Sequence, residues 1–393
     1  MSSKFFTSAI AVDADWRKAV SAVTSKLKSD LDGRVCDLLC VFVSEVYEDF
    51  DTKEFMKEWS EALPARILLG CNSSGVIGTS KEVEMKPAVS AIAMRLPDVK
   101  IQSFFLSSSE INSLREGAAL INELDIYPTD KPHFIVLSDP ATANMNELLR
   151  LFNEGYKKCP VIGGLASGGV ANRSNWLALN GEIYEEGAVG VALMGDIQFE
   201  IIVSQGCRPI GKPYVITKSE ENVLYELAGR PALEIVRDVV HGLSYHDKQL
   251  AQTSLFVGLA MNENKDSFHR GDFLIRNIMG FDPDAGTLVV GEELKVGHTL
   301  QFQLRDAATS EEDLKTLLGT LRETAEPDTR AALLFSCCGR GAGLYGKPNH
   351  DIQMIQSLKG PMPLCGFFAN GELGPVSFKN YIHGYTSSLA IIR

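Results

Sequence analysis

Hydrophobic and polar residues follow the same order three times along this 393-residue chain. Each time, a strand-like run of apolar residues precedes an amphipathic helix, a second strand, a second helix and a short segment containing glycine. The first strands are predicted at 5–12, 101–106 and 299–304, and the helices that follow them at 13–28, 109–124 and 309–323. The second strands are predicted at 38–44, 134–138 and 333–336, and the second helices at 51–62, 144–157 and 351–358.

The glycine segments also resemble one another in sequence. Residues 160–168 (PVIGGLASG) and 363–371 (PLCGFFANG) share the proline, the first glycine, the alanine and the last glycine. Residues 68–76 (LLGCNSSGV) match 162–170 (IGGLASGGV) more weakly. We therefore expect three copies of one α/β unit, in which strand–helix–strand crossovers bring strands side by side. The predicted units are 5–94, 101–194 and 299–391.

Residues 195–298 do not fit the repeat. They contain strand patterns at 199–204, 255–261, 273–279 and 288–290 and a helical pattern at 231–240. Turn residues such as 282–286 (DPDAG) join neighbouring strands, which is typical of an antiparallel arrangement.

The predicted fold is therefore α/β, with mixed sheets, flanking helices and an antiparallel β segment in the C-terminal half. We expect an N-terminal region at 1–212 that holds the first two units. A C-terminal region at 213–393 would hold the antiparallel insert 213–298 and the third unit.

Composition and charge exclude several classes of protein. Hydrophobic residues make up 45% and charged residues 22%, which is usual for a globular protein, and the net charge is −12. We expect neither nucleic acid nor an anionic membrane surface as a partner, because both require clustered basic residues. No apolar run approaches the roughly 20 residues of a membrane helix, and 1–6 (MSSKFF) lacks a signal peptide's apolar core. A cytoplasmic location without membrane insertion is expected.

Three short loops are the first candidates for a ligand site. Each follows a predicted strand, and the carboxyl ends of strands are where ligands usually bind in open α/β sheets. Glycines and small polar residues there expose backbone N–H groups and allow a ligand to approach closely. In any single loop, glycine can equally serve a tight turn, whereas three converging loops would form a pocket. The candidates are Asn72, Ser73, Ser74 and Gly75 in one loop, Ser167 and Gly168 in the second, and Asn370, Gly371 and Glu372 in the third.

Two adjacent cysteines form a second candidate group. In 335–341 (FSCCGRG), Cys337 and Cys338 neighbour Arg340, a setting that can lower a thiol pKa and create a nucleophile. The histidine nearest in sequence is His350, and nothing in the sequence fixes a pairing with it. A structural or ligand-contacting thiol is therefore the preferred interpretation of both cysteines.

Arginines beside glycines form a third group. Arg340, Arg208 and Arg276 each offer a guanidinium suited to a carboxylate, and Cys207 adjoins Arg208. Together they predict an anionic or zwitterionic guest. Ion pairs with nearby carboxylates are the alternative interpretation.

Four motifs, in this order, resemble the FIST family: 206–211 (GCRPIG), 271–277 (GDFLIRN), 335–341 (FSCCGRG) and 366–375 (GFFANGELGP). The resemblance covers nearly the whole chain, as an N-terminal and a C-terminal FIST region. It implies a sensory, ligand-binding role in signal transduction, with amino acids or similar small metabolites as the suggested ligands. Some family members are described as haem-binding nitric-oxide sensors, and others carry an F-box that recruits ubiquitin-ligase machinery.

The sequence shows neither a transmitter helix bundle nor an F-box segment, so it resembles a standalone FIST protein whose signalling partner acts in trans. Our leading hypothesis is a small-molecule sensor, with no catalytic residue and no metal ligand assigned. A cysteine-dependent enzyme is one alternative. The others are a substrate adaptor or partner-recruiting scaffold, and a haem-binding sensor, which would need an axial histidine or cysteine.

Overall fold

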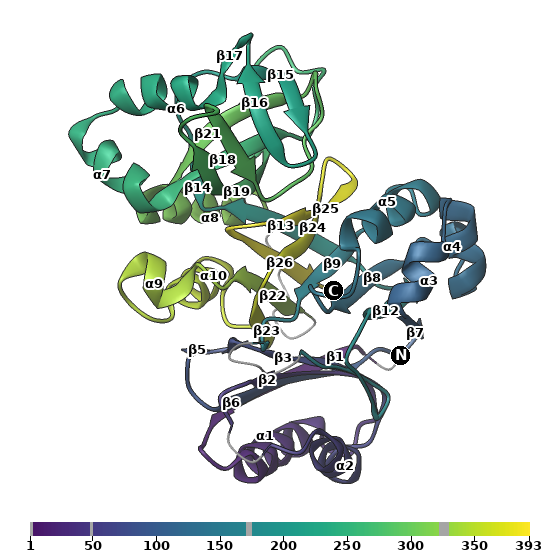
Figure 1. Cartoon of the computed structure of the whole chain (residues 1–393). Coiled ribbons are helices and arrows are strands. Elements are labelled where there is room, and N and C mark those ends of the chain that lie inside the picture. Colours follow the sequence, from purple (N-terminus) through teal and green to yellow (C-terminus); the bar gives the residue numbers. More distant parts are fainter. Residues whose placement is uncertain (1–2, 48–49, 170–174, 322–329) are drawn as a thin grey trace. The chain divides into compact units, whose positions relative to one another are not determined.

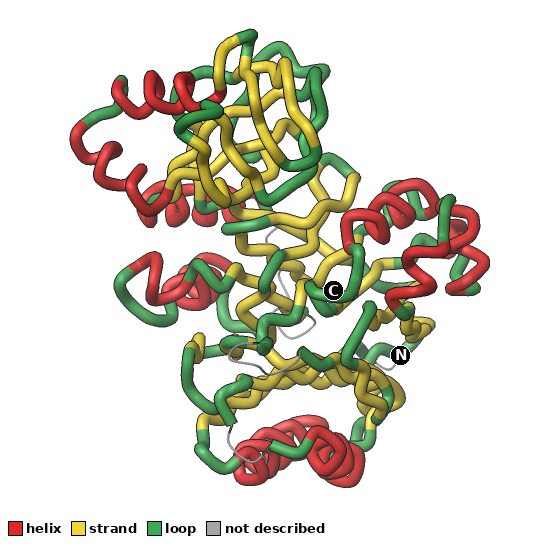
Figure 2. The backbone as a smooth tube through the Cα atoms, viewed as in Figure 1, coloured by secondary structure: helices red, strands yellow, loops and turns green. Residues whose placement is uncertain are grey.

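The computed structural model describes residues 3–47, 50–169, 175–321 and 330–393. Contacts divide the chain into two compact units (Figures 1 and 2). Unit 1 consists of Met1–Val203, Lys315–Ile382 and Thr386–Arg393, and unit 2 consists of Ser204–Leu314 and His383–Tyr385. Unit 2 is therefore an insertion into the chain of unit 1.

Unit 1 contains three six-stranded mixed sheets. Sheet 1 has the order β1 (Phe5–Val12), β6 (Ala88–Arg95), β2 (Cys36–Ser44), β3 (Ala65–Ser73), β10 (Leu177–Leu179) and β11 (Glu182–Tyr184). Sheet 2 has the order β25 (Lys379–His383), β24 (Glu372–Val376), β9 (Val161–Leu165), β8 (His133–Ser138), β12 (Ala188–Gly195) and β7 (Val99–Leu106). Sheet 3 has the order β13 (Phe199–Gln205), β26 (Thr386–Ile392), β22 (Ala331–Cys337), β23 (Leu364–Ala369), β4 (Gly75–Gly78) and β5 (Glu82–Glu84). These sheets, with their helices, confirm the predicted α/β class.

The three sheets are built in the same way. The central pair is parallel in each, β2 with β3, β8 with β9 and β22 with β23, and the neighbours on both sides are antiparallel. A hairpin from another part of the chain completes each sheet. The chain runs from β3 of sheet 1 into β4 of sheet 3, from β9 of sheet 2 into β10 of sheet 1, and from β23 of sheet 3 into β24 of sheet 2.

Helices pack on the outer faces of two of these sheets. Buried tryptophans of α1 (Trp16–Leu31) and α2 (Thr52–Ala62) form one core with the outward side chains of sheet 1. The helices α3 (Ser108–Ser113), α4 (Gly117–Leu124) and α5 (Met145–Gly155) form another core with sheet 2. The remaining helices of unit 1 are η1 (Pro128–Asp130), α9 (Gly341–Tyr345) and α10 (His350–Lys359), and α8 (Ala307–Thr320) begins in unit 2 and ends in unit 1.

Local capping explains one difference from the expected helices. The single helix predicted at 109–124 is two helices, α3 and α4. The Ser107 side chain and the Glu110 side chain form a reciprocal capping box that begins α3. Leu114 then leaves the helical conformation with φ −66° and ψ 136°, and Glu116 is extended before α4 begins.

The inner faces of the three sheets share one hydrophobic core. Phe42 of β2 and Phe335 of β22 both contact Phe367 of β23, with ring centroids 4.9 and 5.5 Å apart respectively. Ile135 and Leu137 of β8 belong to the same core and are fully buried. Burial of this much apolar surface fixes the three parallel pairs relative to one another.

One glycine in each parallel pair permits a close backbone approach. Gly70, Gly163 and Gly366 lie opposite Val41, Val136 and Leu334, and a Cβ atom on each would come within 2.3, 1.8 and 1.7 Å of the opposite carbonyl oxygen. The register therefore makes Gly70 equivalent to Gly163. The sequence match of 68–76 with 162–170, which aligns Gly70 with Gly164, is wrong by one residue.

Unit 2 contains an eight-stranded antiparallel sheet. A pairing between β18 and β21 closes most of it into a ring around its own core. This confirms the predicted antiparallel segment. The elements are β14 (Cys207–Pro209), β15 (Tyr214–Glu220), β16 (Val223–Leu227), β17 (Arg230–Pro231), α6 (Ala232–His241), α7 (Tyr245–Ser254), β18 (Leu255–Ala260), β19 (Phe273–Asp282), β20 (Thr287–Val290) and β21 (Thr299–Arg305).

The first strand predicted for the third repeat, 299–391, belongs to a different sheet from the other strands of that repeat. The strand expected at 299–304 is β21, and it pairs with β14, β15 and β18 inside unit 2. In sheets 1 and 2 the edge strands next to β6 and β12 are β1 and β7, and the strand at the equivalent position in sheet 3, next to β26, is β13. Unit 2 therefore lies in the sequence between β13 and the other strands of the third repeat. The division of the chain into regions at 212/213 stays a prediction.

Candidate functional site

The three candidate loops lie at the points where the chain passes from one sheet of unit 1 to another. Ser74 joins β3 to β4, and Asn370 and Gly371 join β23 to β24. Ser167 follows β9, before the chain reaches β10. We call these passages between sheets the crossovers. Each crossover begins at the carboxyl end of a central parallel strand. Because these strands pack around one core, the three loops meet.

Hydrogen bonds connect the loops directly. The Ser167 Oγ accepts a hydrogen bond from the Ser74 backbone N–H at 2.9 Å and donates one to the Phe368 carbonyl. The Ser74 Oγ lies 3.2 Å from the Cys338 Sγ. The Asn370 N–H donates to the Leu165 carbonyl at 3.0 Å. We call Ser74, Ser167, Cys338 and Asn370 the strand-end site.

Accessibility differs within the strand-end site. The side chains of Cys338 and Asn370 are exposed, and Ser74 is partly exposed. Ser167 is buried beneath them, with 8% of its surface exposed. The site therefore presents a hydroxyl, a thiol and an amide to solvent above a buried hydroxyl.

The other loop residues hold the backbone in place. The Asn72 Oδ1 accepts a hydrogen bond from the Trp176 N–H at 2.9 Å, and the Ser73 Oγ donates to the Gly75 carbonyl at 2.9 Å. A Cβ atom at Gly168 would lie 2.3 Å from the Asn72 amide nitrogen. These contacts favour a structural role for Asn72, Ser73 and Gly75, at the adjoining ends of β3 and β4, and for Gly168.

Glu372, at the start of β24, is a fully buried carboxyl group. Its Oε2 accepts hydrogen bonds from the Thr386 hydroxyl at 2.6 Å and the Thr386 N–H at 3.2 Å. Burial raises the Glu372 pKa to about 8, against the hydrogen bonds from Thr386. The group is therefore mainly neutral at pH 7, and its Oε1 has no hydrogen-bond partner among the described residues.

Arg340 is also buried and is paired with an acid. Its Nε and Nη2 donate to the two carboxylate oxygens of Asp351 at 2.9 and 3.2 Å, and its Nη2 also contacts the Tyr345 hydroxyl at 2.6 Å. Burial would raise the Asp351 pKa, but the Arg340 charge outweighs it and lowers that pKa to about 2. Arg340 is therefore compensated, with only its Nη1 lacking a partner among the described residues.

Cys338 does not have the properties expected of a nucleophile. Burial by the surrounding protein raises the pKa of its thiol, and the nearby Glu372 carboxyl adds to the increase. His350 stacks on Tyr345 with centroids 3.5 Å apart, and its Nδ1 lies 3.1 Å from an Asp351 oxygen. The hypothesis that Arg340 lowers a thiol pKa is therefore wrong for Cys338. Cys337 is partly buried at the end of β22.

The predicted residues of unit 2 are ion-paired or buried. Arg208 contacts Asp306 at 2.8 Å and Asp247 at 2.5 Å, and Arg276 contacts Glu292 at 2.6 Å. Cys207 is fully buried in a small apolar cluster with Phe256, Phe273 and Ile275. Arg208 and Arg276 therefore form ion pairs with nearby carboxylates, which was the alternative interpretation of these arginines.

Two buried acids near the candidate residues were not among the predicted site residues. The Glu82 Oε1 accepts a hydrogen bond from the Ile352 N–H, and burial raises the Glu82 pKa to about 7. The Asp139 carboxylate follows β8 and accepts hydrogen bonds from Thr142 at 2.6 Å and Asn175 at 2.9 Å. The position of Asp139 directly after a buried strand is a signal that could have identified it.

In the part of the chain that the structure describes, no group of three or more His, Cys, Asp or Glu side chains could hold a metal ion. Among the helices of the same residues, none is long and apolar enough to cross a membrane.

Comparison with known families and proteins gives a clear assignment. The FIST N domain model matches residues 37–230, and the FIST C domain model matches residues 232–375. Uncharacterized proteins of Mycobacterium bovis and Mycobacterium tuberculosis are each 32% identical over 96% of both chains. An uncharacterized protein of Methanocaldococcus jannaschii is 22% identical over 77% of this chain and 60% of its own.

Among solved structures, cyanuric acid hydrolase from A. caulinodans covers 99% of both chains at 9% identity, with a TM-score of 0.31. At that TM-score the likeness supports no conclusion about fold or activity. The two domain models, by contrast, cover most of the chain and meet near residue 231. The chain belongs to the FIST family, whose domains are sensory domains of signal transduction.

Proposed function

We propose that the strand-end site binds a small polar metabolite, an amino acid or a similar anionic or zwitterionic molecule. The protein would thereby act as a ligand sensor in the cytoplasm, with a signalling partner in trans. The observation that supports this most strongly is that Ser74, Ser167 and Asn370 of the three crossovers meet one another and Cys338, which directly follows β22. FIST domains bind small ligands, so a ligand site is expected somewhere in the chain.

The electrostatics around the site favour a ligand with a carboxylate. Glu372, with its raised pKa, adds little negative charge at pH 7. The charge of Arg340 is balanced by Asp351, and its Nη1 keeps an unused donor. A carboxylate would therefore meet hydroxyl and amide groups without repulsion from an ionised acid.

The shared architecture of the three sheets supports a further part of the proposal. We infer that the three repeats arose as copies of one another. The strand order, the central parallel pair and the glycine that permits a close backbone approach recur in each of the three sheets. Equivalent crossovers then supply different side chains to one site. A ligand could signal only if it binds two states of the protein with different affinities.

The described residues give less support to a cysteine-dependent enzyme and to a haem-binding sensor. A cysteine-dependent enzyme needs an activated thiol, and the pKa of Cys338 is raised. Haem would need an axial ligand, and His350, the histidine nearest the two cysteines in sequence, contacts Tyr345 and Asp351.

The proposal can be tested by measuring the melting temperature with amino acids and small organic acids at pH 7. We expect at least one compound to raise it in a concentration-dependent manner. For that compound, Ser74→Ala and Asn370→Ala should each weaken binding by about 3- to 10-fold, the loss expected for one hydrogen bond.

A matched control is Ser357→Ala, which removes an exposed hydroxyl on α10 that donates only to its own helix. It should leave affinity unchanged. The proposal is wrong if no compound in the set binds, or if the two site variants bind a ligand as tightly as the control does.

A further inference from the structure

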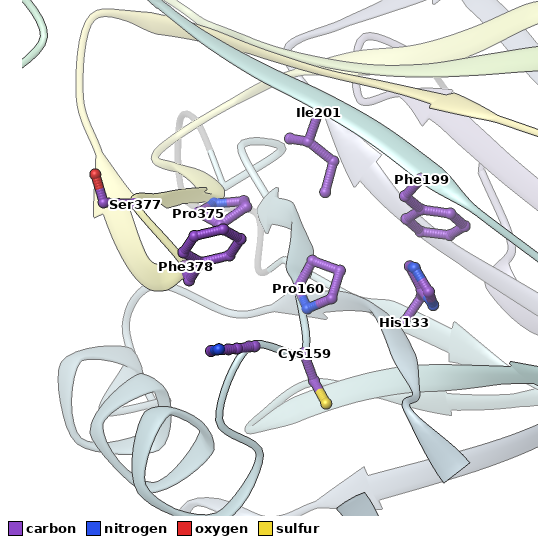
Figure 3. A pocket seen from close by; sticks show the side chains of 9 residues that line it. His133, Cys159, Pro160, Phe199, Ile201, Pro375, Ser377 and Phe378 are labelled. Atoms are coloured by element: carbon purple, nitrogen blue, oxygen red, sulfur yellow. The ribbon is translucent and has the colours of Figure 1, made fainter. Parts of the chain in front are cut away.

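A second cavity in unit 1 lies at the opposite ends of two strands that carry the strand-end site. Ser138 and Leu165 end β8 and β9 near that site, whereas His133 begins β8 and Pro160 directly precedes β9. His133 and Pro160 line a pocket of about 370 Å³ (Figure 3). Its volume falls within the usual range of small-molecule sites.

The walls of this cavity are mainly apolar. Phe199 and Ile201 project from β13 on one side, and Pro375 and Phe378 come from the hairpin of β24 and β25 on the other, as Figure 3 shows. The His133 ring lies 4.9 Å from the Phe199 ring. The complete lining is His133, Lys158, Cys159, Pro160, Phe199, Ile201, Pro375, Ser377 and Phe378.

The hairpin that forms one wall has an uncommon backbone. Ser377 and Phe378 have φ angles of 50° and 68°, in the left-handed region that asparagine and glycine usually occupy in two-residue turns. Phe378 is nevertheless 75% exposed, so burial within unit 1 does not explain an aromatic residue there. A strained backbone that carries an exposed aromatic side chain is a feature of ligand-binding clamps.

The polar groups of the cavity are few, and one is cationic. Lys158 places its Nζ 5.9 Å from the Phe378 ring centroid. Among the ion pairs found in the described residues, none involves Lys158. Burial lowers the His133 pKa, so its ring is neutral at pH 7 and can stack or share one hydrogen bond.

We propose that this cavity binds a small aromatic carboxylate, with the ring between Phe199, Ile201 and Phe378 and the carboxylate beside Lys158. Apolar walls favour the ring because its transfer from water is favourable. The single cation at the rim selects a negative charge over a neutral end group. This site is separate from the strand-end site and does not depend on the proposed function.

The test uses the full chain and a matched pair of ligands, 3-phenylpropionate and 3-phenylpropionamide, in isothermal titration calorimetry. We expect the acid to bind with micromolar to low-millimolar affinity and at least 5-fold more tightly than the amide. Phe378→Ala should weaken binding of the acid by at least 10-fold, and Lys158→Gln should abolish the preference for the acid.

Lys157→Gln is the control, because Lys157 is an exposed neighbour that does not line the cavity. It should leave both affinities within 2-fold, as should Ser74→Ala at the strand-end site. The inference is overturned if the acid does not bind at 10 mM, if the amide binds equally well, or if Phe378→Ala has no effect. Binding that Ser74→Ala abolishes would place the acid at the strand-end site and would also overturn it.

Discussion

Unit 1 and unit 2 both contain glycine motifs with polar side chains, but only in unit 1 do such motifs meet. Ser74 and Ser167 come from two of the crossovers, and Cys338 directly follows β22. Ser74 lies within hydrogen-bonding distance of both Ser167 and Cys338, which are distant from it in sequence. In unit 2, Arg208 and Arg276 instead contact carboxylates of their own unit. Glycine motifs of similar sequence can therefore form a candidate ligand site in one unit and ion pairs in the other, depending on which side chains the strand order places next to them.

The charges of the two units also differ in environment. Arg340 in unit 1 is 1% exposed, whereas the Arg208 side chain in unit 2 is 27% exposed. When one member of a buried ion pair is removed, the remaining charge has no water to solvate it. In a partly exposed pair, water can solvate the remaining charge. The predictions below test these contrasts.

The largest effect is expected from a methyl group at the parallel pair of sheet 3. Gly366→Ala would place its Cβ 1.7 Å from the Leu334 carbonyl oxygen, in backbone that cannot move away alone. We expect a loss of more than about 4 kcal/mol in unfolding free energy, or no folded protein. Gly319→Ala, on the exposed side of α8 with open space around it, should instead stabilise by about 0.5–1 kcal/mol. Denaturant unfolding measures the change in unfolding free energy of both variants. Equal changes would contradict the close approach of Gly366 to the Leu334 carbonyl oxygen.

The two arginine sites should respond unequally to loss of charge. Arg340→Met leaves Asp351 buried without its partner and should cost about 3–5 kcal/mol. Arg208→Met leaves two partly exposed carboxylates and should cost about 1 kcal/mol. Urea unfolding at pH 7 measures both. A double variant that also carries Asp351→Asn should recover part of the first loss, and no recovery would contradict the pairing.

The buried Glu372 carboxyl of unit 1 predicts that the stability of the protein depends on pH. Its pKa of about 8 in the folded protein lies above the ordinary value of 4.5, so the folded state holds a proton that the unfolded state releases. The stability from this group is complete below about pH 4.5 and is lost as pH rises through about 8. Between pH 5 and pH 7, wild type should lose roughly 2–3 kcal/mol relative to Glu372→Gln. Unfolding of both proteins across this range is the measurement, and parallel pH profiles would contradict the raised pKa.

The smallest effect concerns the rate at which Cys338 is alkylated. Its raised pKa reduces the thiolate fraction at pH 7.5, so iodoacetamide should label it several-fold more slowly than glutathione. Mass spectrometry of the labelled peptide gives the rate, with Cys338→Ser as the control for assignment. Labelling faster than glutathione would revive the nucleophile hypothesis.

Much of the fold could be predicted from the sequence because its strands and helices have regular hydrophobic patterns. The strand at Phe5–Val12 and the antiparallel segment follow from those patterns. The pattern could not show that β21 belongs to unit 2, because a strand of alternating residues looks the same in either sheet. The exchange of hairpins between sheets was also invisible, since it depends on long-range pairing.

The candidate site was predicted only in part for similar reasons. Ser74, Ser167 and Asn370 were found because glycine and small polar residues follow each central strand. The partners of Arg340 and Arg208 were not, because Asp351 and Asp306 lie in helices or loops whose packing a single sequence does not reveal. The environment of Glu372 likewise depends on Thr386, which comes from another strand.

The account depends most on the claim that a ligand occupies the strand-end site, and Cys338 provides a direct reporter. Cys338 is an exposed residue, and its Sγ lies 3.2 Å from the Ser74 hydroxyl. The measurement is the alkylation rate of Cys338 as a function of concentration of the compound that raises the melting temperature. We predict protection of at least 5-fold, with a midpoint at the Kd obtained from thermal shift. An unchanged rate at a saturating concentration would contradict the claim.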